Sequence, residues 1–248
     1  MRLDEITPAK LDEIREAKKA ESSAATANRY MALVRAILRL AHESDMLPLV
    51  PKVRMFAIEK LDPRWLTREQ FDTLLEHLPE HVRPMARFAV ATGLRRANIT
   101  MLRWAQVDMK RRHAWIPGRD AKGKRALPVP LNREAMAILR EQLGKHATWV
   151  FTYRAHPVSQ VTTRAWREAV KAAGHPGLRF HDLRHTWASW HAQAGTPLQI
   201  LQELGGWRSA QLVQRYAHFA AGHLADFAEN SARKPDQVRR RARARAAK

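Results

Sequence analysis

Three short runs of the chain gather side chains that can act on a phosphodiester. Thr92–Arg96 ends in two arginines after a glycine, His181–His185 places a histidine and an arginine three residues apart, and Arg215–His218 holds a tyrosine. Cleavage without a metal ion needs positive charge on the phosphoryl oxygens, a nucleophile, and a proton for the leaving oxygen. Arginine suits the first task because its planar fork binds phosphate through two hydrogen bonds and keeps its charge. Tyrosine, serine or histidine can be the nucleophile, so these runs together favour chemistry on a phosphate ester.

Each run also has a structural reading that involves no chemistry. Arginines after a glycine, such as Arg95, are common at helix ends, and Tyr216 alone would be a half-buried helical residue. His181 and His185 lie four residues apart and could bind a metal ion. However, no glutamate lies between them as in metalloproteases, and the chain has no cysteine. We therefore expect no metal site and no cofactor.

The first region that must support these residues is predicted to be mostly helical. Residues 1–62 contain a helix that Ser22 or Ser23 could cap. Its apolar face is expected to consist of residues at helical spacing, namely Tyr30, Leu33, Val34, Ile37, Leu38 and Ala41. The proline-containing segment 47–51 ends that helix. Residues 63–66, which include Pro63, are interpreted as a linker.

The second region, residues 67–230, is predicted to mix helices with a few short strands. Thr67 and Gln70 form a capping-box pattern that starts a helix. His113–Ile116 and Arg125–Leu131 are expected to be the arms of a β-hairpin whose basic connection holds Lys122. Residues 149–151 are a further strand candidate, and helices are predicted over about 82–92, 133–143, 163–173, 182–194, 198–204, 210–217 and 220–232. The expected fold class is therefore α+β, mostly helical, with a small antiparallel sheet.

The charge of the chain points to a polyanionic partner. The 248 residues contain 44 Lys and Arg against 24 acidic residues, a formal net charge of +20. The stretch 231–248 is expected to be a basic, disordered tail, but the rest of the chain is strongly basic without it. No apolar run has the length of a membrane span, and the first residues lack the apolar stretch of a secretory signal. We expect a cytoplasmic protein without membrane contact.

Four segments in one order resemble the signature boxes of the tyrosine recombinases, specifically the phage and prophage integrases. Ala91–Trp104 resembles the first arginine box, and Lys122–Leu131 resembles the β-hairpin that carries the catalytic lysine. Phe180–Ser189 resembles the histidine–arginine box, and Leu204–His218 resembles the segment that ends in the nucleophile. The resemblance covers about residues 66–230. It implies a DNA breaking-rejoining catalytic domain in which DNA is cut through a 3′-phosphotyrosine without metal or ATP.

The resemblance implies a role for each matching residue. Arg95 and Arg184 would bind the non-bridging oxygens, Lys122 would protonate the leaving 5′ oxygen, and His181 would assist proton transfer. Trp207 stands where most family members have histidine, and it could donate one hydrogen bond through its indole N–H. Tyr216 would be the nucleophile, with nearby arginines favouring its phenolate. Contacts to the DNA backbone are expected from Arg96, Lys124, Arg125 and Arg208.

Two departures from the family pattern stand out. Asn98 lies three residues after Arg95, where many relatives have an acidic residue, so it could orient its neighbours only by hydrogen bonding. Residues 1–62 resemble only the later part of the helical, SAM-like core-binding domain, and an arm-binding domain before it is expected to be absent.

The implied function is site-specific recombination by a homotetramer on two sites of double-stranded DNA, from a protein that is monomeric when free. A type IB topoisomerase, which shares the chemistry but acts alone, and a catalytically inactive DNA-binding remnant are the alternatives.

Overall fold

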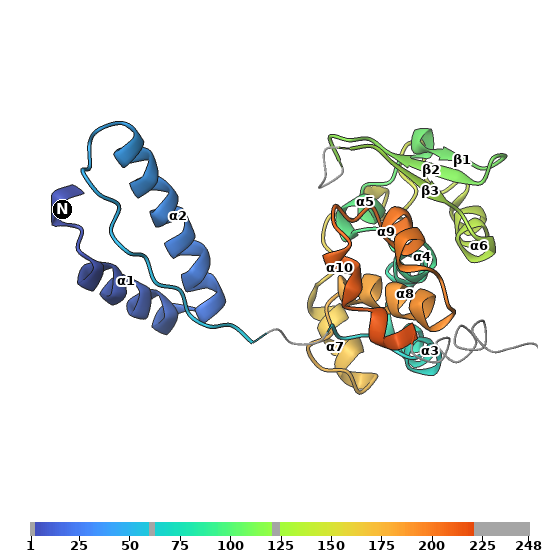
Figure 1. Cartoon of the computed structure of the whole chain (residues 1–248). Helices are drawn as coiled ribbons and strands as arrows, with labels where there is room; N and C mark the ends of the chain where they lie inside the picture. Colours follow the sequence, from blue (N-terminus) through green and yellow to red (C-terminus); the bar gives the residue numbers. More distant parts are fainter. Residues whose placement is uncertain (1–2, 60–62, 121–124, 221–248) are drawn as a thin grey trace, which may run out of the picture. The chain divides into compact units, whose positions relative to one another are not determined.

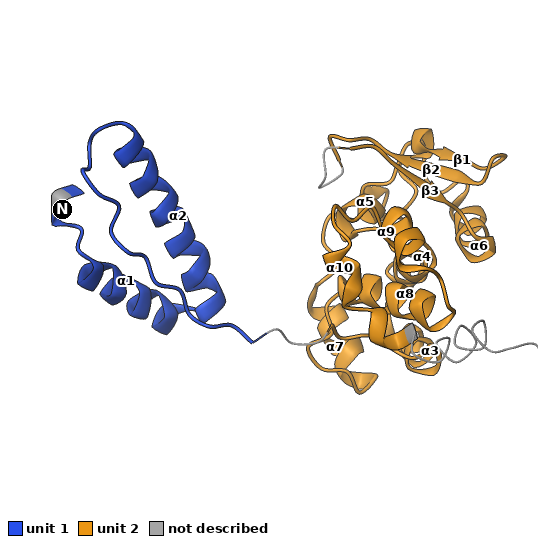
Figure 2. Ribbon diagram, viewed as in Figure 1, with its two compact units in different colours: residues 1–61 blue, residues 62–248 orange. Residues whose placement is uncertain are grey.

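The computed structural model describes residues 3–59, 63–120 and 125–220 (Figure 1). The chain divides into two compact units, residues 1–61 and 62–248 (Figure 2). Lys122, Lys124, the predicted helix at 220–232 beyond Ala220 and the predicted tail lie outside the described residues. None of the helices in the described part is long and apolar enough to span a bilayer.

Unit 1 is a pair of packed helices after one short 3₁₀ turn. The turn is η1 (Leu3–Glu5), and the helices are α1 (Pro8–Glu21) and α2 (Ala24–Glu43). The hydroxyl of Ser23 accepts a hydrogen bond from the amide of Thr26 and caps α2, so Ser23 rather than Ser22 is the cap. The apolar residues that these two helices and the following segment bury together are Leu11, Met31, Leu38, Ala41 and Leu47.

The apolar face predicted for α2 was only partly right. Leu38 and Ala41 are buried, but Tyr30, Leu33 and Ile37 are about half exposed. The buried face is displaced around the helix toward Ala27 and Met31, which pack toward α1. The apolar stripe of α2 is therefore wider than the surface that α1 and the following segment cover.

Unit 2 is mostly helical, with α8 in contact with α4, α9 and the 3₁₀ turn η3 (Figure 1). Its helices are α3 (Arg68–His77), α4 (Arg83–Thr92), α5 (Arg96–Thr100), α6 (Arg133–Gln142), α7 (Arg164–Ala172), α8 (Asp182–Gln193), α9 (Leu198–Gly205) and α10 (Gln211–Gln214), with 3₁₀ turns η2 (Trp104–Gln106) and η3 (Ala217–Ala220). The capping box of Thr67 and Gln70 is present, and Asn132 caps α6. Leu66, from the segment interpreted as a linker, is fully buried in this unit.

A three-stranded antiparallel sheet lies at one end of unit 2 (Figure 1). Its strands are β1 (Val107–Asp108), β2 (His113–Ile116) and β3 (Leu127–Pro130), with Ala114 opposite Val129. Alternate residues of β2 and β3 are buried, which is the period-2 pattern of a sheet with one face on the core. The predicted hairpin is thus confirmed, and the fold is α+β and mostly helical, as expected.

Two predicted elements of unit 2 differ from the observed ones. Residues 149–151 are not a strand: Trp149 makes one isolated bridge to Arg103, and the first strand after it is β4 (Thr152–Tyr153), paired with β5 (His156–Pro157). Val150 and Phe151 are both buried, so this stretch lacks the alternation of a half-exposed strand. The helix predicted over 210–217 is one turn, α10, because the amide of Tyr216 bonds the carbonyl of Val213 and turns the chain early.

Candidate functional site

A pocket of about 450 Å³ in unit 2 brings together five of the six residues predicted to be catalytic. Those that line it are Arg95, His181, Arg184, Trp207 and Tyr216. They come from the loop after α4, the start of α8, the turn after α9 and the turn after α10. His185, Arg208 and Arg215 line the same pocket. Its surface is therefore rich in arginine and histidine.

Arg184 is held in the wall of the pocket by two backbone carbonyls. Its side chain is buried, and its terminal nitrogens donate hydrogen bonds to the carbonyl oxygens of Gly93 and Gly205. Burial lowers the pKa of this guanidinium to about 9, and the nearby charge of Arg95 acts in the same direction. The two bonds use two of the five N–H groups of a guanidinium.

Arg95 reaches the pocket from a helix junction. Gly93 ends α4 in the left-handed conformation (φ +65°), and the chain then turns so that Arg95 precedes the first residue of α5. Burial lowers the pKa of Arg95. Among the described residues, neither Arg95 nor Arg184 forms an ion pair with a carboxylate. The charges of these two arginines are thus not compensated by a carboxylate of the described chain.

The described side-chain hydrogen bond of Asn98 is made away from Arg95. Its buried side chain donates a hydrogen bond of 2.9 Å to the carbonyl of Asp120. Asn98 therefore fixes the turn that follows β2.

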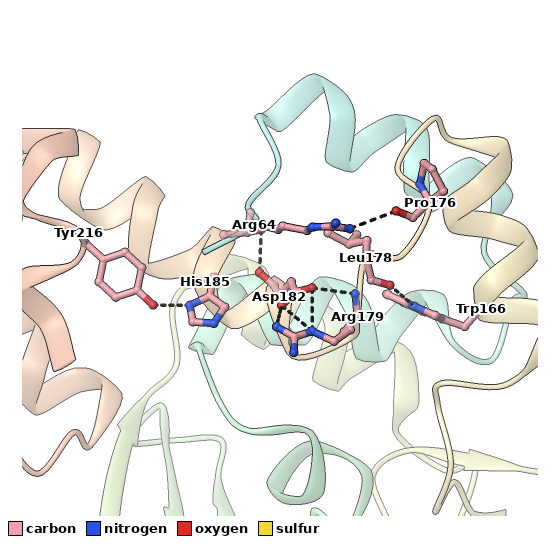
Figure 3. A network of polar contacts seen from close by, with 9 residues as sticks. Arg64, Trp166, Pro176, Leu178, Arg179, Asp182, His185 and Tyr216 are labelled. Atoms are coloured by element: carbon pink, nitrogen blue, oxygen red, sulfur yellow. Dashed lines mark hydrogen bonds and ion pairs between the residues drawn. The ribbon is translucent and has the colours of Figure 1, made fainter. Parts of the chain in front are cut away.

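The loop before α8 leads to His181, and Figure 3 shows the contacts of Pro176, Leu178 and Arg179 in this loop. The carboxylate of Asp182 is fully buried and receives bonds from the amide and guanidinium of Arg179. The indole of Trp166 bonds the carbonyl of Leu178, which holds the loop from the other side. Because the carboxylate of Asp182 is paired with Arg179, it does not form an ion pair with Arg95 or Arg184. His181 lies exposed at the pocket, and its pKa is lowered by partial desolvation and by the charge of Arg184.

Tyr216 contacts a histidine that the sequence singled out only as a metal-ligand candidate. The side chain of Tyr216 is 1% exposed, and its hydroxyl lies 2.5 Å from Nδ1 of His185. The two side chains point toward one another (Figure 3). Residues 185 and 216 are 31 positions apart, so no spacing rule links them. A histidine one turn after His181 on the same helix was the available signal.

Nearby arginines favour the phenolate of Tyr216, as expected, but burial outweighs them. Burial raises the pKa of its phenol to about 12, while the charges of Arg215 and Arg184 lower it by less. His185 is shifted in the opposite sense: burial lowers its pKa to about 4, so its ring is neutral near pH 7. The pair is a neutral phenol beside a neutral imidazole.

Trp207 is stacked on the pocket residues. The guanidinium of Arg184 lies 4.3 Å from its ring centroid, and its ring also packs near Tyr216 and Trp187. Gly205 permits this packing, because a Cβ at that position would lie 2.0 Å from the Trp207 ring. The Trp207 ring thus makes stacking contacts with Arg184 and with neighbouring aromatic rings.

The described residues that were expected to contact DNA differ in their location and contacts. Arg208 is exposed and lines the pocket, and Arg125 is exposed before β3. Arg96 donates hydrogen bonds to the Ser159 carbonyl and the Gln160 side chain. Among the described residues there is no cluster of three or more acidic, histidine or cysteine side chains that could hold a metal ion.

A mostly helical domain with a small sheet, in which two arginines without a described carboxylate partner line a pocket with a tyrosine, has the fold of a DNA breaking-rejoining catalytic domain. The chain belongs to the phage integrase family, whose sequence model matches residues 64–223.

Individual relatives agree with that family. The chain is 39% identical to the integrase of Salmonella phage P22 over an alignment of 225 residues, and the match covers 85% of this chain and 58% of that protein. It is 30% identical to the integrase of Escherichia phage 186, covering 83% of this chain and 60% of that protein. The chain thus spans about three-fifths of the length of these relatives.

Solved structures share the fold. A lambda integrase dimer bound to a COC′ core site aligns with a TM-score of 0.74 at 19% identity, covering 88% of this chain and 81% of that one. The XerH recombinase bound to palindromic difH substrate aligns with a TM-score of 0.69 at 18% identity, covering 92% and 73%.

Proposed function

We propose that the chain is a site-specific DNA recombinase that cuts and rejoins DNA through a 3′-phosphotyrosine on Tyr216. The observation that carries the proposal is the meeting of Arg95, Arg184 and Tyr216 in one pocket without an acidic partner for either arginine in the described chain. Two like charges this close repel each other, and a bound phosphodiester would relieve that repulsion. Tyr216, which lines the same pocket, would attack the phosphorus.

The other roles follow from the same chemistry. His181, at the mouth of the pocket, would hydrogen-bond the phosphate, and Lys122 would protonate the leaving 5′ oxygen. Trp207 would hold Arg184 by stacking. Arg125 and Arg208, both exposed, together with Lys124 would contact the DNA backbone.

The wider assembly is part of the proposal. Unit 1 would be a portion of a core-binding domain that grips double-stranded DNA, and residues 67–230 would be the catalytic domain. Relatives solved with DNA, such as the lambda integrase dimer on a core site, support a DNA partner. We propose a tetramer on two DNA sites, assembled from monomers in the cytoplasm.

The test is covalent capture of DNA by the full chain. A pool of duplexes with random sequence and a nick near the centre would be incubated with the protein, and adducts that survive denaturation would be isolated and sequenced. We expect one enriched sequence class, joined to the protein through Tyr216. Tyr216→Phe should form no adduct yet still shift the enriched duplex in a gel.

Two matched controls use the other tyrosines. Tyr30→Phe and Tyr153→Phe alter exposed phenols elsewhere in the chain and should leave the adduct yield unchanged. An adduct that persists in Tyr216→Phe would show that another residue is the nucleophile. A chain that binds the pool but never forms an adduct would be an inactive DNA-binding protein. Relaxation of supercoiled plasmid by the monomer would instead indicate a type IB topoisomerase.

A further inference from the structure

The contact between His185 and Tyr216 raises the question of where the phenolic proton goes. A tyrosine that attacks phosphorus must lose its proton, because an aryl phosphate ester carries none on the bridging oxygen. Tyr216 is almost completely buried, so bulk water has little access to its hydroxyl. The arginines that line the pocket stay protonated and can only donate hydrogen bonds. A proton acceptor is therefore needed inside the site.

His185 is positioned to be that acceptor. Its Nδ1 lies 2.5 Å from Tyr216 Oη, and both side chains line the pocket that holds Arg95 and Arg184. His181 is on the same face of α8, but its ring packs edge-on against the ring of His185, with centroids 5.4 Å apart. His185 thus stands between the more exposed histidine and the phenol.

We propose that His185 is the general base of the cleavage step and takes the phenolic proton on Nδ1 as Tyr216 attacks. The inference rests on the proposed function and adds His185 to the residues that carry out cleavage. The Oη–P bond forms while the bond from phosphorus to the 5′ oxygen breaks. The proton of Oη goes to His185, and the 5′ oxygen receives a proton from the leaving-group side of the site. In rejoining, protonated His185 returns its proton to Oη as the phosphotyrosine bond breaks.

Proton transfer must accompany the attack, because transfer beforehand is strongly uphill. The pKa of the Tyr216 phenol is about 12 and that of His185 about 4. As the Oη–P bond forms, the phenolic oxygen loses its basicity, and the direction of transfer reverses. The negative charge of the phosphate also raises the pKa of a histidine beside it.

The charged and titratable groups around His185 fit a base that is neutral at rest. His181 and Asp182 on α8, Arg179 in the loop before it, and Arg215 beside Tyr216 all act on its ring. Burial is the largest influence, and the cations and His181 oppose protonation, whereas Asp182 favours it. His185 is therefore available as a base from mildly acidic pH upward.

The test is the pH dependence of single-turnover cleavage of the captured duplex by His185→Asn. The amide of asparagine can occupy the position of Nδ1 and keep a hydrogen bond, but it cannot take a proton. We expect the variant to cleave roughly 10²–10⁴-fold more slowly at pH 7. Its rate should rise about tenfold per pH unit between about pH 6 and 8, below the pKa of Arg184, because hydroxide must then remove the phenolic proton. The wild-type rate should be nearly flat over the same range.

A more acidic tyrosine provides a second measurement. A fluorinated tyrosine at position 216 needs less help in losing its proton, so it should restore most of the rate lost in His185→Asn. It should not restore the rate of Arg184→Lys, whose loss concerns charge on the non-bridging oxygens. His191→Asn, a change of another partly buried histidine on α8, should leave both the rate and the pH profile unchanged.

The outcomes separate this inference from the proposed function. Adduct formation by His185→Asn at the wild-type rate and with the wild-type pH profile would overturn the role of His185 and leave recombination standing. Faster cleavage by the variant would also overturn it, because the hydrogen bond would then restrain Tyr216. The absence of any adduct with the wild-type chain would refute both proposals.

Discussion

Arg184 and Trp207 form a stacked pair, with the guanidinium carbon 4.3 Å from the ring centroid. Trp207 is nine residues before Tyr216, and its ring also packs near the ring of that tyrosine. The tryptophan therefore links the proposed phosphate clamp to the proposed nucleophile. The sequence indicated only that the indole N–H could donate one hydrogen bond, and the stacking on Arg184 is a further contact.

Replacement of Trp207 distinguishes stacking from hydrogen bonding. A cation–π contact that is shielded from water contributes about 2 kcal/mol, so Trp207→Ala should slow cleavage by roughly 10- to 30-fold. Trp207→Phe keeps an aromatic face and should retain most of the rate. If the N–H were the important group, both variants would lose equally in a single-turnover assay. Trp149→Phe, which alters a stacked pair with Arg103 outside the pocket, is the control.

Gly93 should resist substitution for two separable reasons. Any L-residue at φ +65° costs about 1–2 kcal/mol, and a Cβ there would lie 2.3 Å from the ring of Trp187, which should cost a further 1–3 kcal/mol or so. Gly144→Ala is the matched control, since Gly144 has φ +79° but open space around it. Urea unfolding followed by tryptophan fluorescence reports unit 2 alone, because all eight tryptophans lie between residues 65 and 207. Equal losses for the two variants would contradict the clash.

The neutral state of His185 predicts an acid sensitivity of the fold. Its pKa is about 4 in the folded protein against an ordinary value of 6.5, so the unfolded chain binds more protons between these values. The stabilising effect of the neutral, buried ring is present above pH 6.5 and is lost as the pH falls toward 4. We expect about 2–3 kcal/mol from this source. Urea unfolding at several pH values should show a flatter dependence for His185→Asn than for the wild type; parallel curves would argue against the shift.

The assignment of Lys122 as the acid that protonates the leaving oxygen can be tested with sulfur. Lys122→Ala should slow cleavage by roughly 10²–10⁴-fold. A duplex with sulfur in place of the 5′ oxygen has a leaving group that scarcely needs a proton, and it should recover most of that rate. The same duplex should not rescue Arg184→Ala. Rescue of Lys124→Ala instead would mean that the neighbouring lysine is the acid.

Metal independence gives a further expectation. The proposed charge neutralisation comes from Arg95, Lys122 and Arg184, so adduct formation should proceed at the same rate in excess EDTA. A strict requirement for added magnesium or zinc would contradict that assignment and would direct attention back to His181 and His185 as ligands.

Local patterns predicted the helices and the hairpin well, because their signals lie within a few residues of each other. The capping box of Thr67, the cap at Asn132 and the alternating burial of β2 and β3 are all short-range features. The part of a helix that becomes buried depends on contacts with segments that are distant in the sequence. The wide apolar stripe of α2 does not reveal which part α1 will cover, and Tyr30 and Ile37 were placed wrongly for that reason.

The candidate site also has features that the sequence predicts and features that it does not. Arg95, His181, Arg184, Trp207 and Tyr216 could be selected from the order of their motifs, and the pocket brings them together. The contacts that surround these side chains could not be predicted from the motifs. The bonds from Arg184 to the carbonyls of Gly93 and Gly205 join segments 91 and 21 residues away. The burial of Tyr216, which outweighs the effect of the arginines on its pKa, also depends on such distant segments.

The carbonyl bonds of Arg184 also have an entropic consequence. A free arginine side chain loses about 2 kcal/mol of rotamer freedom when it is fixed by a ligand. Arg184 has already lost that freedom on folding, because its guanidinium is stacked on Trp207 and bonded to two backbone carbonyls. An anion that enters the pocket therefore meets a donor whose ordering is complete, and the affinity gained from its remaining N–H groups is not offset by immobilising a long side chain.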